Sequence, residues 1–337
     1  MNSYLKISRL HNTMKRILPY LVVLSFLVGG CSGQVLEPVY EPQMGLSLYF
    51  CPEDDCTRVF LDEIENSKVS LDCAFFDLDN KQMINAFSIK SEEIPVRIVI
   101  DHQNYEGQME GSSIKKAKGK QYMHNKFCVI DSKRVITGSV NPTTNELLKN
   151  KNNLLVIDST TLASNYADEF EELWNGVYAA GNPVLTPQVV TETLIIENYF
   201  CPEDNCQGHA IEALQQANES ISFMTFSFTD KEIADVIMTK PVSVRGIFDS
   251  RSAAGEGSQY ERMQGFGFDV HKDAFKGTMH HKVFIIDNKT VITGSYNPTG
   301  SGNTRNDENM LIIHNEVVGR AFAREFEELY EGAISKN

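Results

Sequence analysis

Short apolar runs alternate with amphipathic stretches along most of the chain. In the first half, Leu46–Phe50, Val69–Phe76 and Val96–Asp101 are apolar runs of strand length. The two stretches between them, Thr57–Ser67 and Asn80–Ser88, carry apolar residues at helical spacing. This alternation of strands and helices predicts an α/β fold in which helices flank a mixed β-sheet.

The following segment predicts a hairpin, one further strand and a closing helix. Phe127–Ile130 and Val135–Thr137 are apolar runs separated by a short polar turn, as is typical of an antiparallel hairpin. Leu154–Ile157 is expected as another strand, and Leu162–Trp174 as the helix that closes the unit.

The same motifs then occur a second time in the same order. Tyr49–Asp54 recurs as Tyr199–Asp204, and Met123–Asn141 is matched by Met279–Asn297. The period of about 150 residues is too long for a solenoid repeat, so we expect two like domains packed about a pseudo-two-fold axis. The predicted organisation is a first unit at 45–180, a linker at 181–192 and a second unit at 193–337.

The N-terminus has the order of a secretory signal. Residues 1–16 carry four basic residues and no acid, and an apolar run then ends in Gly29-Gly30. This order predicts a signal peptide at 1–30 and a tether at 31–44. Cys31 follows Leu27-Val28-Gly29-Gly30, which resembles a bacterial lipobox. That resemblance implies an exported lipoprotein anchored through Cys31, on the outer face of the cytoplasmic membrane or in the cell envelope. A plain signal peptide or an uncleaved anchor is the alternative.

Composition and charge narrow the classes of protein that remain. Of the 337 residues, 42% are hydrophobic and 23% are charged, which is typical of a folded globular chain. The 31 basic and 45 acidic residues give a formal charge of −14, which disfavours generic binding to nucleic acid backbones. No stretch reaches the roughly 18 apolar residues of a membrane-spanning helix.

Each unit contains one cluster of chemically active residue types. The pattern H-x-K-x4-D-x6-G-S-x-N occurs in both halves. Its members are His124, Lys126, Asp131, Gly138, Ser139 and Asn141 in the first unit, and His280, Lys282, Asp287, Gly294, Ser295 and Asn297 in the second. The double motif resembles the phospholipase D superfamily.

The spacing within the motif has a physical meaning of its own. Residues two apart on a strand share a face, so His124 and Lys126 are expected side by side. Asp131 falls on the opposite parity, and we expect for it, as for Asp287, a structural or turn-stabilising role. The Gly-Ser-x-Asn segment brings a hydroxyl, an amide and backbone N–H groups together, and with the lysine these can hold a phosphate oxyanion.

The family resemblance implies a mechanism that needs both units. One histidine attacks phosphorus and forms a phosphohistidine, and the other protonates the leaving alcohol and then activates water. Neither a metal nor another cofactor is expected. Glu308, 28 residues after His280, resembles the acid that orients a catalytic histidine in this family, while the matching residue in the first unit is Asn152. We therefore expect Glu308 beside His280, with His280 as nucleophile and His124 as acid.

The cysteines follow the repeat. Cys51 and Cys56 recur as Cys201 and Cys206, and export permits oxidation, so local disulfides are expected within each pair. Pairing between units or a four-cysteine zinc site are the alternatives. Cys73 and Cys128 lie in apolar strands and are expected as buried free thiols.

The sequence thus predicts a phospholipase D-type phosphodiesterase acting on phospholipid at a membrane. It is expected as a monomer with an internal pseudo-dimer. A nuclease-type phosphodiesterase is an alternative that the acidic charge disfavours, and a non-enzymatic envelope protein is another that the intact motifs disfavour.

Overall fold

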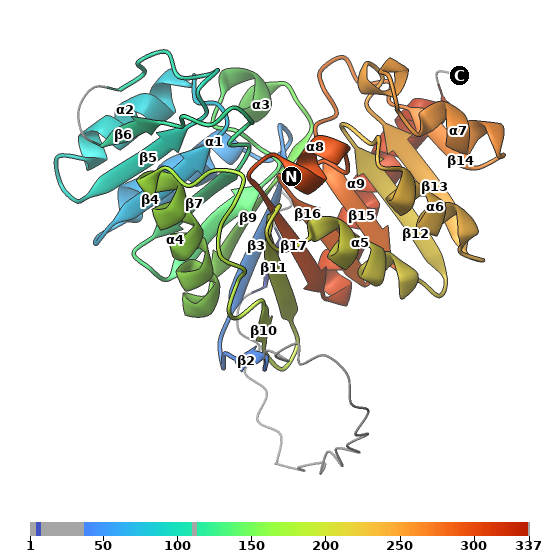
Figure 1. The fold of residues 1–337 in the computed structure, drawn as a ribbon, viewed down its shortest axis with the longest axis horizontal. Coiled ribbons are helices and arrows are strands. Elements are labelled where there is room, and N and C mark those ends of the chain that lie inside the picture. The colour runs from blue at the N-terminus through green and yellow to red at the C-terminus, as the bar shows by residue number, and fades with distance from the viewer. Residues whose placement is uncertain (1–4, 8–36, 110–112, 336–337) are drawn as a thin grey trace, which may run out of the picture.

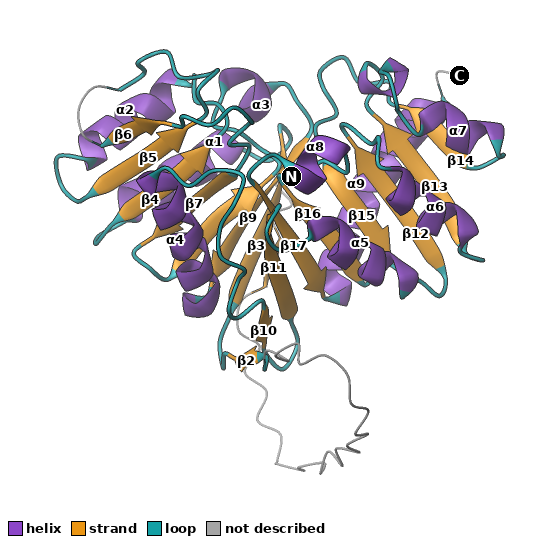
Figure 2. Cartoon of the chain, viewed as in Figure 1, coloured by secondary structure: helices purple, strands orange, loops and turns teal. Residues whose placement is uncertain are grey.

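Two α/β units lie side by side in the computed structural model, each built on its own mixed sheet (Figure 1). The structure describes residues 5–7, 37–109 and 113–335. Helices and strands alternate in both units (Figure 2). The predicted α/β class with a duplicated unit is confirmed.

The elements of the two units correspond one to one along most of their length. The first unit contains, in order, β3 (Gly45–Cys51), α1 (Cys56–Asn66), β4 (Leu71–Phe75), α2 (Lys81–Lys90), β5 (Val96–Ile100), β6 (Ile114–Lys116), β7 (Lys126–Ile130), β8 (Arg134–Gly138), α3 (Thr144–Leu148), β9 (Asn152–Asp158) and α4 (Thr160–Asn175). The second contains β11 (Ile195–Cys201), α5 (Cys206–Gln215), β12 (Ser220–Thr225), α6 (Lys231–Thr239), β13 (Ser243–Phe248), a 3-10 turn (Ser252–Ala254), α7 (Tyr260–Gly265), β14 (Asp269–Lys272), β15 (Lys282–Ile286), β16 (Thr290–Gly294), α8 (Gly300–Thr304), β17 (Glu308–His314) and α9 (Glu316–Ile334).

Strand order is the same in both sheets. It runs β3-β9-β8-β7-β4-β5-β6 in the first and β11-β17-β16-β15-β12-β13-β14 in the second. β4 pairs parallel with β5 and antiparallel with β7, so the sheet is mixed as expected. Every element that the sequence predicted in the first unit is present. Capping residues set the ends of the helices, as α4 illustrates. It begins after Ser159, whose Oγ accepts a hydrogen bond from Leu162 N, and it ends at Gly176, which has a φ of 87°.

The segments expected as tether and linker form strands. Within the predicted linker, β10 (Gln188–Val190) pairs antiparallel with β11, and β2 (Val39–Tyr40), from the predicted tether, pairs parallel with β10. Both extend the second sheet at its edge because Val189 is buried against the core. The segments expected as tether, 31–44, and linker, 181–192, thus each contribute a short strand to the edge of the second sheet.

Part of the predicted signal peptide is also seen. β1 (Leu5–Ile7) pairs antiparallel with β3. Cys31 lies outside the described residues. In the part of the chain that the structure describes, we find no helix with the length and apolar character needed to span a bilayer.

A hydrophobic core shared by the two units fixes their relative position. Tyr166 of α4 packs on Phe200 of β11 with ring centroids 5.0 Å apart, and the equivalent Phe322 of α9 packs on Phe50 of β3 at 5.2 Å. These reciprocal contacts lie in one buried cluster drawn from both sheets. Burial of this shared apolar surface therefore holds the two units together.

Three disulfides are present among the described residues. Cys51 is bonded to Cys56 and Cys201 to Cys206, which are the local pairs expected from the sequence. Cys73 and Cys128, expected as free thiols, are instead bonded to each other. They are directly opposed in the register of β4 and β7, with Cα atoms 4.1 Å apart.

The cross-strand disulfide is expected to stabilise the fold more than either local one. Its cysteines are 55 residues apart, against 5 for each local pair. By restricting the unfolded chain, a disulfide that closes the longer loop raises the free energy of unfolding by about 4 kcal/mol, compared with about 2 kcal/mol for a local bond. Denaturant unfolding of the Cys73→Ala/Cys128→Ala protein should show the larger loss, with Cys51→Ala/Cys56→Ala as the matched control. Equal losses in the two proteins would contradict this ranking.

Candidate active site

Hydrogen bonds between backbone groups join the two units at the start of the two repeated motifs. His124 N donates to Asp307 O at 2.9 Å, and Asp307 N donates to Tyr122 O at 3.0 Å. On the other side His280 N donates to Lys151 O at 2.8 Å. Each histidine therefore lies beside the residue that precedes a strand of the opposite unit. That residue is Asp307, before β17, for His124 and Lys151, before β9, for His280.

Glu308 consequently meets the histidine of the first unit. Its Oε2 lies 2.7 Å from Nδ1 of His124, and its side chain is fully buried. Ser295 Oγ donates to the same carboxylate oxygen at 2.8 Å. The expectation that Glu308 lies beside His280 is wrong. The backbone hydrogen bond between His124 and Asp307 places the next residue, Glu308, beside the histidine of the other unit.

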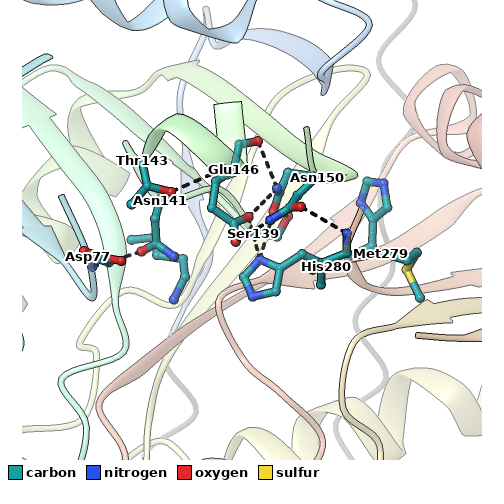
Figure 3. Close-up of polar contacts among 12 residues, drawn as sticks. Asp77, Ser139, Asn141, Thr143, Glu146, Asn150, Met279 and His280 are labelled. Atoms are coloured by element: carbon teal, nitrogen blue, oxygen red, sulfur yellow. Dashed lines mark hydrogen bonds and ion pairs between the residues drawn. The ribbon is translucent and has the colours of Figure 1, made fainter. Parts of the chain in front are cut away.

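His280 has two partners, both from the first unit. Its Nδ1 lies 3.0 Å from Asn152 Oδ1 and 3.0 Å from Glu146 Oε2. Figure 3 shows the Glu146 carboxylate and the His280 ring pointing toward each other. Ser139 Oγ donates to Asn152 Oδ1 at 2.9 Å, as Ser295 does to Glu308. Both imidazoles are thus held through Nδ1, and within the described residues Nε2 of each has no hydrogen-bond partner.

Two buried lysines lie against the histidines. Lys126 Nζ donates to His124 O and Lys282 Nζ donates to His280 O, each at 2.7 Å. Burial lowers the pKa of Lys126 to about 8, and burial together with the nearby Lys126 charge lowers the pKa of Lys282 to about 7. The lysines therefore place positive charge where an oxyanion would be bound.

The acids and imidazoles are also shifted by their surroundings. Burial lowers the pKa of His124 well below its usual value, and the charges of Lys126 and Lys282 lower it further. Burial also lowers the pKa of His280, but the charge of Glu146 opposes this shift. Burial raises the pKa of Glu308 to about 7 against the opposing charge of Lys126. For Glu146, burial raises the pKa, but the charges of His280 and Lys282 and the hydrogen bonds to His280 and Asn152 together hold it at about 2.

The serines have a different place from the one expected. Ser139 and Ser295 are completely buried, and their hydroxyls hold Asn152 and Glu308 in position. They therefore support the partners of the histidines and do not face a substrate.

The asparagines that end the two motifs are also largely enclosed. Asn141 Oδ1 accepts from Asp77 N at 3.3 Å, so its carbonyl oxygen is engaged by the backbone. Asn297 Oδ1 is buried without a partner in the described residues.

Asp131 and Asp287 hold turns at the far end of the hairpin strands. Asp131 Oδ1 accepts from the backbone N–H of Lys68, Val69 and Ser70, at distances of 2.9, 2.6 and 3.2 Å. Asp287 accepts from the three equivalent N–H groups of the second unit. The structure thus gives both aspartates a structural position.

Gly138 and Gly294 are required by close backbone approach. Gly138 has φ 138° and Gly294 has φ 134°. A Cβ at either residue would lie 2.3 Å from a backbone carbonyl oxygen, that of Asn153 or Asn309. Only glycine therefore lets the Ser-x-Asn segment lie against the next strand.

Three site residues were missed by the sequence analysis. Glu146 lies in a helix of five residues, too short to show a period, and Phe76 and Phe226 carry no charge that would mark them. Phe76 and Phe226 occupy equivalent places, with ring centroids 4.8 Å from those of His124 and His280. The lysine ammonium groups lie over the same rings, at 5.3 and 5.2 Å. On the His280 side there is a pocket of about 420 Å³, lined by Glu146, Phe226, Asp249, Arg251, Ser252, Thr278 and His280.

Possible metal ligands gather elsewhere. Within the described ranges, the one group of three or more such side chains is Glu169, Glu172 and Glu203. It includes neither histidine of the double motif.

Comparison with known proteins identifies the family. A family model described as cardiolipin synthase, PLD-like domain, matches residues 60–174 and 210–330, one stretch in each unit. The chain therefore belongs to the phospholipase D superfamily, and the family unit occurs in it twice. At this level it is a phosphodiesterase, as its relatives are.

Individual relatives match parts of the chain. The mitochondrial cardiolipin hydrolase of Xenopus laevis is 32% identical over 155 residues, which are 44% of this chain and 70% of that protein. A phospholipase D of Rickettsia prowazekii is 30% identical over 130 residues, 38% of this chain and 63% of that protein. The phosphatidylserine synthase of Haemophilus influenzae matches 84% of this chain and 85% of its own, with a TM-score of 0.63 and 12% identity, which shows a shared fold alone.

Proposed function

We propose that the protein hydrolyses a phosphodiester, most favourably of a phospholipid, through a covalent phosphohistidine and without a metal ion. The observation that carries the proposal is the pairing of two imidazoles in one site. Each is held through Nδ1 by residues of the opposite unit, and each has a buried lysine beside it. A nucleophile, an acid and two cations are the groups that a double displacement at phosphorus needs.

The two histidines take different parts. Nε2 of His124 attacks phosphorus, so that a P–N bond forms and the P–O bond to the leaving alcohol breaks. That oxygen takes its proton from Nε2 of His280. Neutral His280 then accepts a proton from water, whose oxygen attacks phosphorus and breaks the P–N bond. Lys126 and Lys282 balance the charge on the phosphoryl oxygens in both steps.

The charges around the two rings support this assignment over the reverse one that the sequence suggested. The nucleophile must be neutral, and burial together with the charges of Lys126 and Lys282 lowers the pKa of His124. The acid must carry a proton, and although burial lowers the pKa of His280, the Glu146 carboxylate 3.0 Å from Nδ1 favours its charged form. Glu308, 2.7 Å from His124, would balance the positive charge of the phosphorylated imidazole.

Several features favour phospholipid as the substrate. The relatives named above include a cardiolipin hydrolase and a phospholipase D. The chain carries a formal charge of −14, which opposes close approach of a long nucleic acid. Lipidation of Cys31, as the lipobox resemblance implies, would hold the enzyme at a membrane. Phe76 and Phe226 add apolar surface beside both histidines.

The purified protein is expected to cleave phospholipid in vesicles in the presence of EDTA. Phosphatidylcholine and cardiolipin vesicles should be compared with single-stranded DNA and RNA, and released headgroup and nucleotide should be measured. Preference for nucleic acid would replace the substrate assignment by the nuclease alternative. Loss of activity in EDTA with recovery in zinc or magnesium would contradict the metal-free mechanism.

The acid should be dispensable when the leaving group needs no proton. His280→Ala is expected to lose phospholipid cleavage by on the order of 10²-fold or more but to retain the burst of nitrophenol from bis(4-nitrophenyl) phosphate. His124→Ala should lose both activities. Acid-quenched wild-type protein should carry labelled phosphate on the peptide containing His124. Label on the His280 peptide would reverse the roles.

Activity should be greatest on the acidic side of neutrality. The free enzyme needs neutral His124, whose pKa is far below 6.5, and protonated His280, whose pKa is also lowered. Lys282 and Lys126 lose their charges as the pH rises past about 7 and about 8. We expect kcat/KM to fall across that range, since this ratio reports groups of the free enzyme. A ratio that rises steadily to pH 9 would be inconsistent with these charge states.

A further inference from the structure

The two units differ in where they place a carboxylate. The second unit has Glu308 at the start of β17 and Gly302 in α8. At the matching positions the first unit has Asn152 at the start of β9 and Glu146 in α3. Each unit thus has one acid and one neutral residue at this pair of positions, in opposite arrangement.

The exchange preserves the geometry around both histidines. Asn152 Oδ1 accepts from Ser139 Oγ and lies 3.0 Å from His280 Nδ1, just as Glu308 Oε2 accepts from Ser295 Oγ and meets His124. What Asn152 lacks is the negative charge. Glu146 supplies a carboxylate oxygen 3.0 Å from the same ring nitrogen.

Local helix structure does not explain the direction of the Glu146 side chain. Thr143 caps α3, and its Oγ1 accepts from Glu146 N at 3.3 Å. In a capping box the glutamate would bond back to Thr143 N, but that group donates to Asn141 O at 2.7 Å. The carboxylate instead accepts from Asn150 and Asn152 and faces His280 (Figure 3).

The second unit has no room for the same arrangement. A Cβ at Gly302 would lie 2.3 Å from Asn297 O. A glutamate there would require the backbone to move, so position 308 must carry the acid in that unit.

We propose that Glu146 is the positioning carboxylate of His280, taking over from α3 the part that Glu308 plays for His124. The catalytic role of His280 in this proposal rests on the proposed function, whereas the pairing of Glu146 with His280 does not. The carboxylate accepts a hydrogen bond from Nδ1–H of His280, which keeps that proton on Nδ1 and orients Nε2 toward the substrate. The titratable groups nearest His280 are Glu146, Lys282, Lys126 and His124. Asp249 and Arg251 line the same pocket, and Glu146 is the acid in direct contact.

The pair 146 and 152 permits a test by exchange. Glu146→Gln should lower kcat on phospholipid vesicles on the order of 10²-fold with little change in KM. Asn152→Asp alone should also lower it, because two carboxylates at hydrogen-bond distance cannot both ionise freely. The double variant Glu146→Gln/Asn152→Asp moves the acid to the position used in the other unit and should recover activity to within about tenfold of wild type.

Two outcomes of this exchange would overturn the proposal. One is unchanged activity in Glu146→Gln, and the other is a double variant no better than the worse single one. A role for Glu146 in stability alone predicts additive losses and no recovery. Glu92→Gln, an exposed glutamate in the turn after α2, is the matched control and should behave as wild type. Melting temperatures of all variants identify any loss due to unfolding.

A second measurement does not depend on activity. Imidazole nitrogen resonances should be titrated in wild type, Glu146→Gln and the double variant, with His124→Asn used for assignment. We expect the pKa of His280 to fall in Glu146→Gln and to recover in the double variant, while that of His124 stays constant. No change at His280 overturns the pairing. A change at His280 in a protein that cleaves no diester would refute the proposed function and leave the pairing standing.

Discussion

The backbone bridges between the units are the constraint on which the site depends. Met123 pairs with Asp307 and Lys151 pairs with Met279, so each histidine segment completes its hydrogen bonds on the opposite unit. A buried N–H must find an acceptor, and here the acceptor belongs to the other half of the molecule. Neither unit can therefore form its half of the site alone, and the tandem duplication places the required partner in the same chain.

Burial sets the chemistry once the bridges have set the geometry. Two lysines, two glutamates and two imidazoles lie in a region from which most water is excluded, so each charge is stabilised chiefly by its neighbours. The two glutamates differ: burial prevails at Glu308 and raises its pKa, while at Glu146 the charges of His280 and Lys282 and its hydrogen bonds together prevail over burial and lower it. A pair of nearly symmetric units thus acquires two unlike histidines, as the proposed division into nucleophile and acid requires.

Local patterns predicted the regular elements well and the irregular ones poorly. Strands such as β5 and helices such as α4 are long enough for their periodicity to show. The helix α3 has five residues and β10 has three, so neither has a recognisable period. The bond between Cys73 and Cys128 was missed for another reason. It depends on the register of β4 against β7, and two apolar strands far apart in sequence do not reveal their register.

The sequence by itself determined the superfamily, the duplication and the identity of both histidine–lysine pairs, because these reside in residue types at fixed short spacings. It could not determine which histidine Glu308 would meet. A separation of 28 residues along the chain is equally compatible with a contact inside the unit and one across the pseudo-axis. Only the tertiary structure decided between them, since the bridge at Asp307 turns the next side chain toward His124. The same packing brought Glu146 to His280, a contact between residues 134 positions apart that no local pattern records.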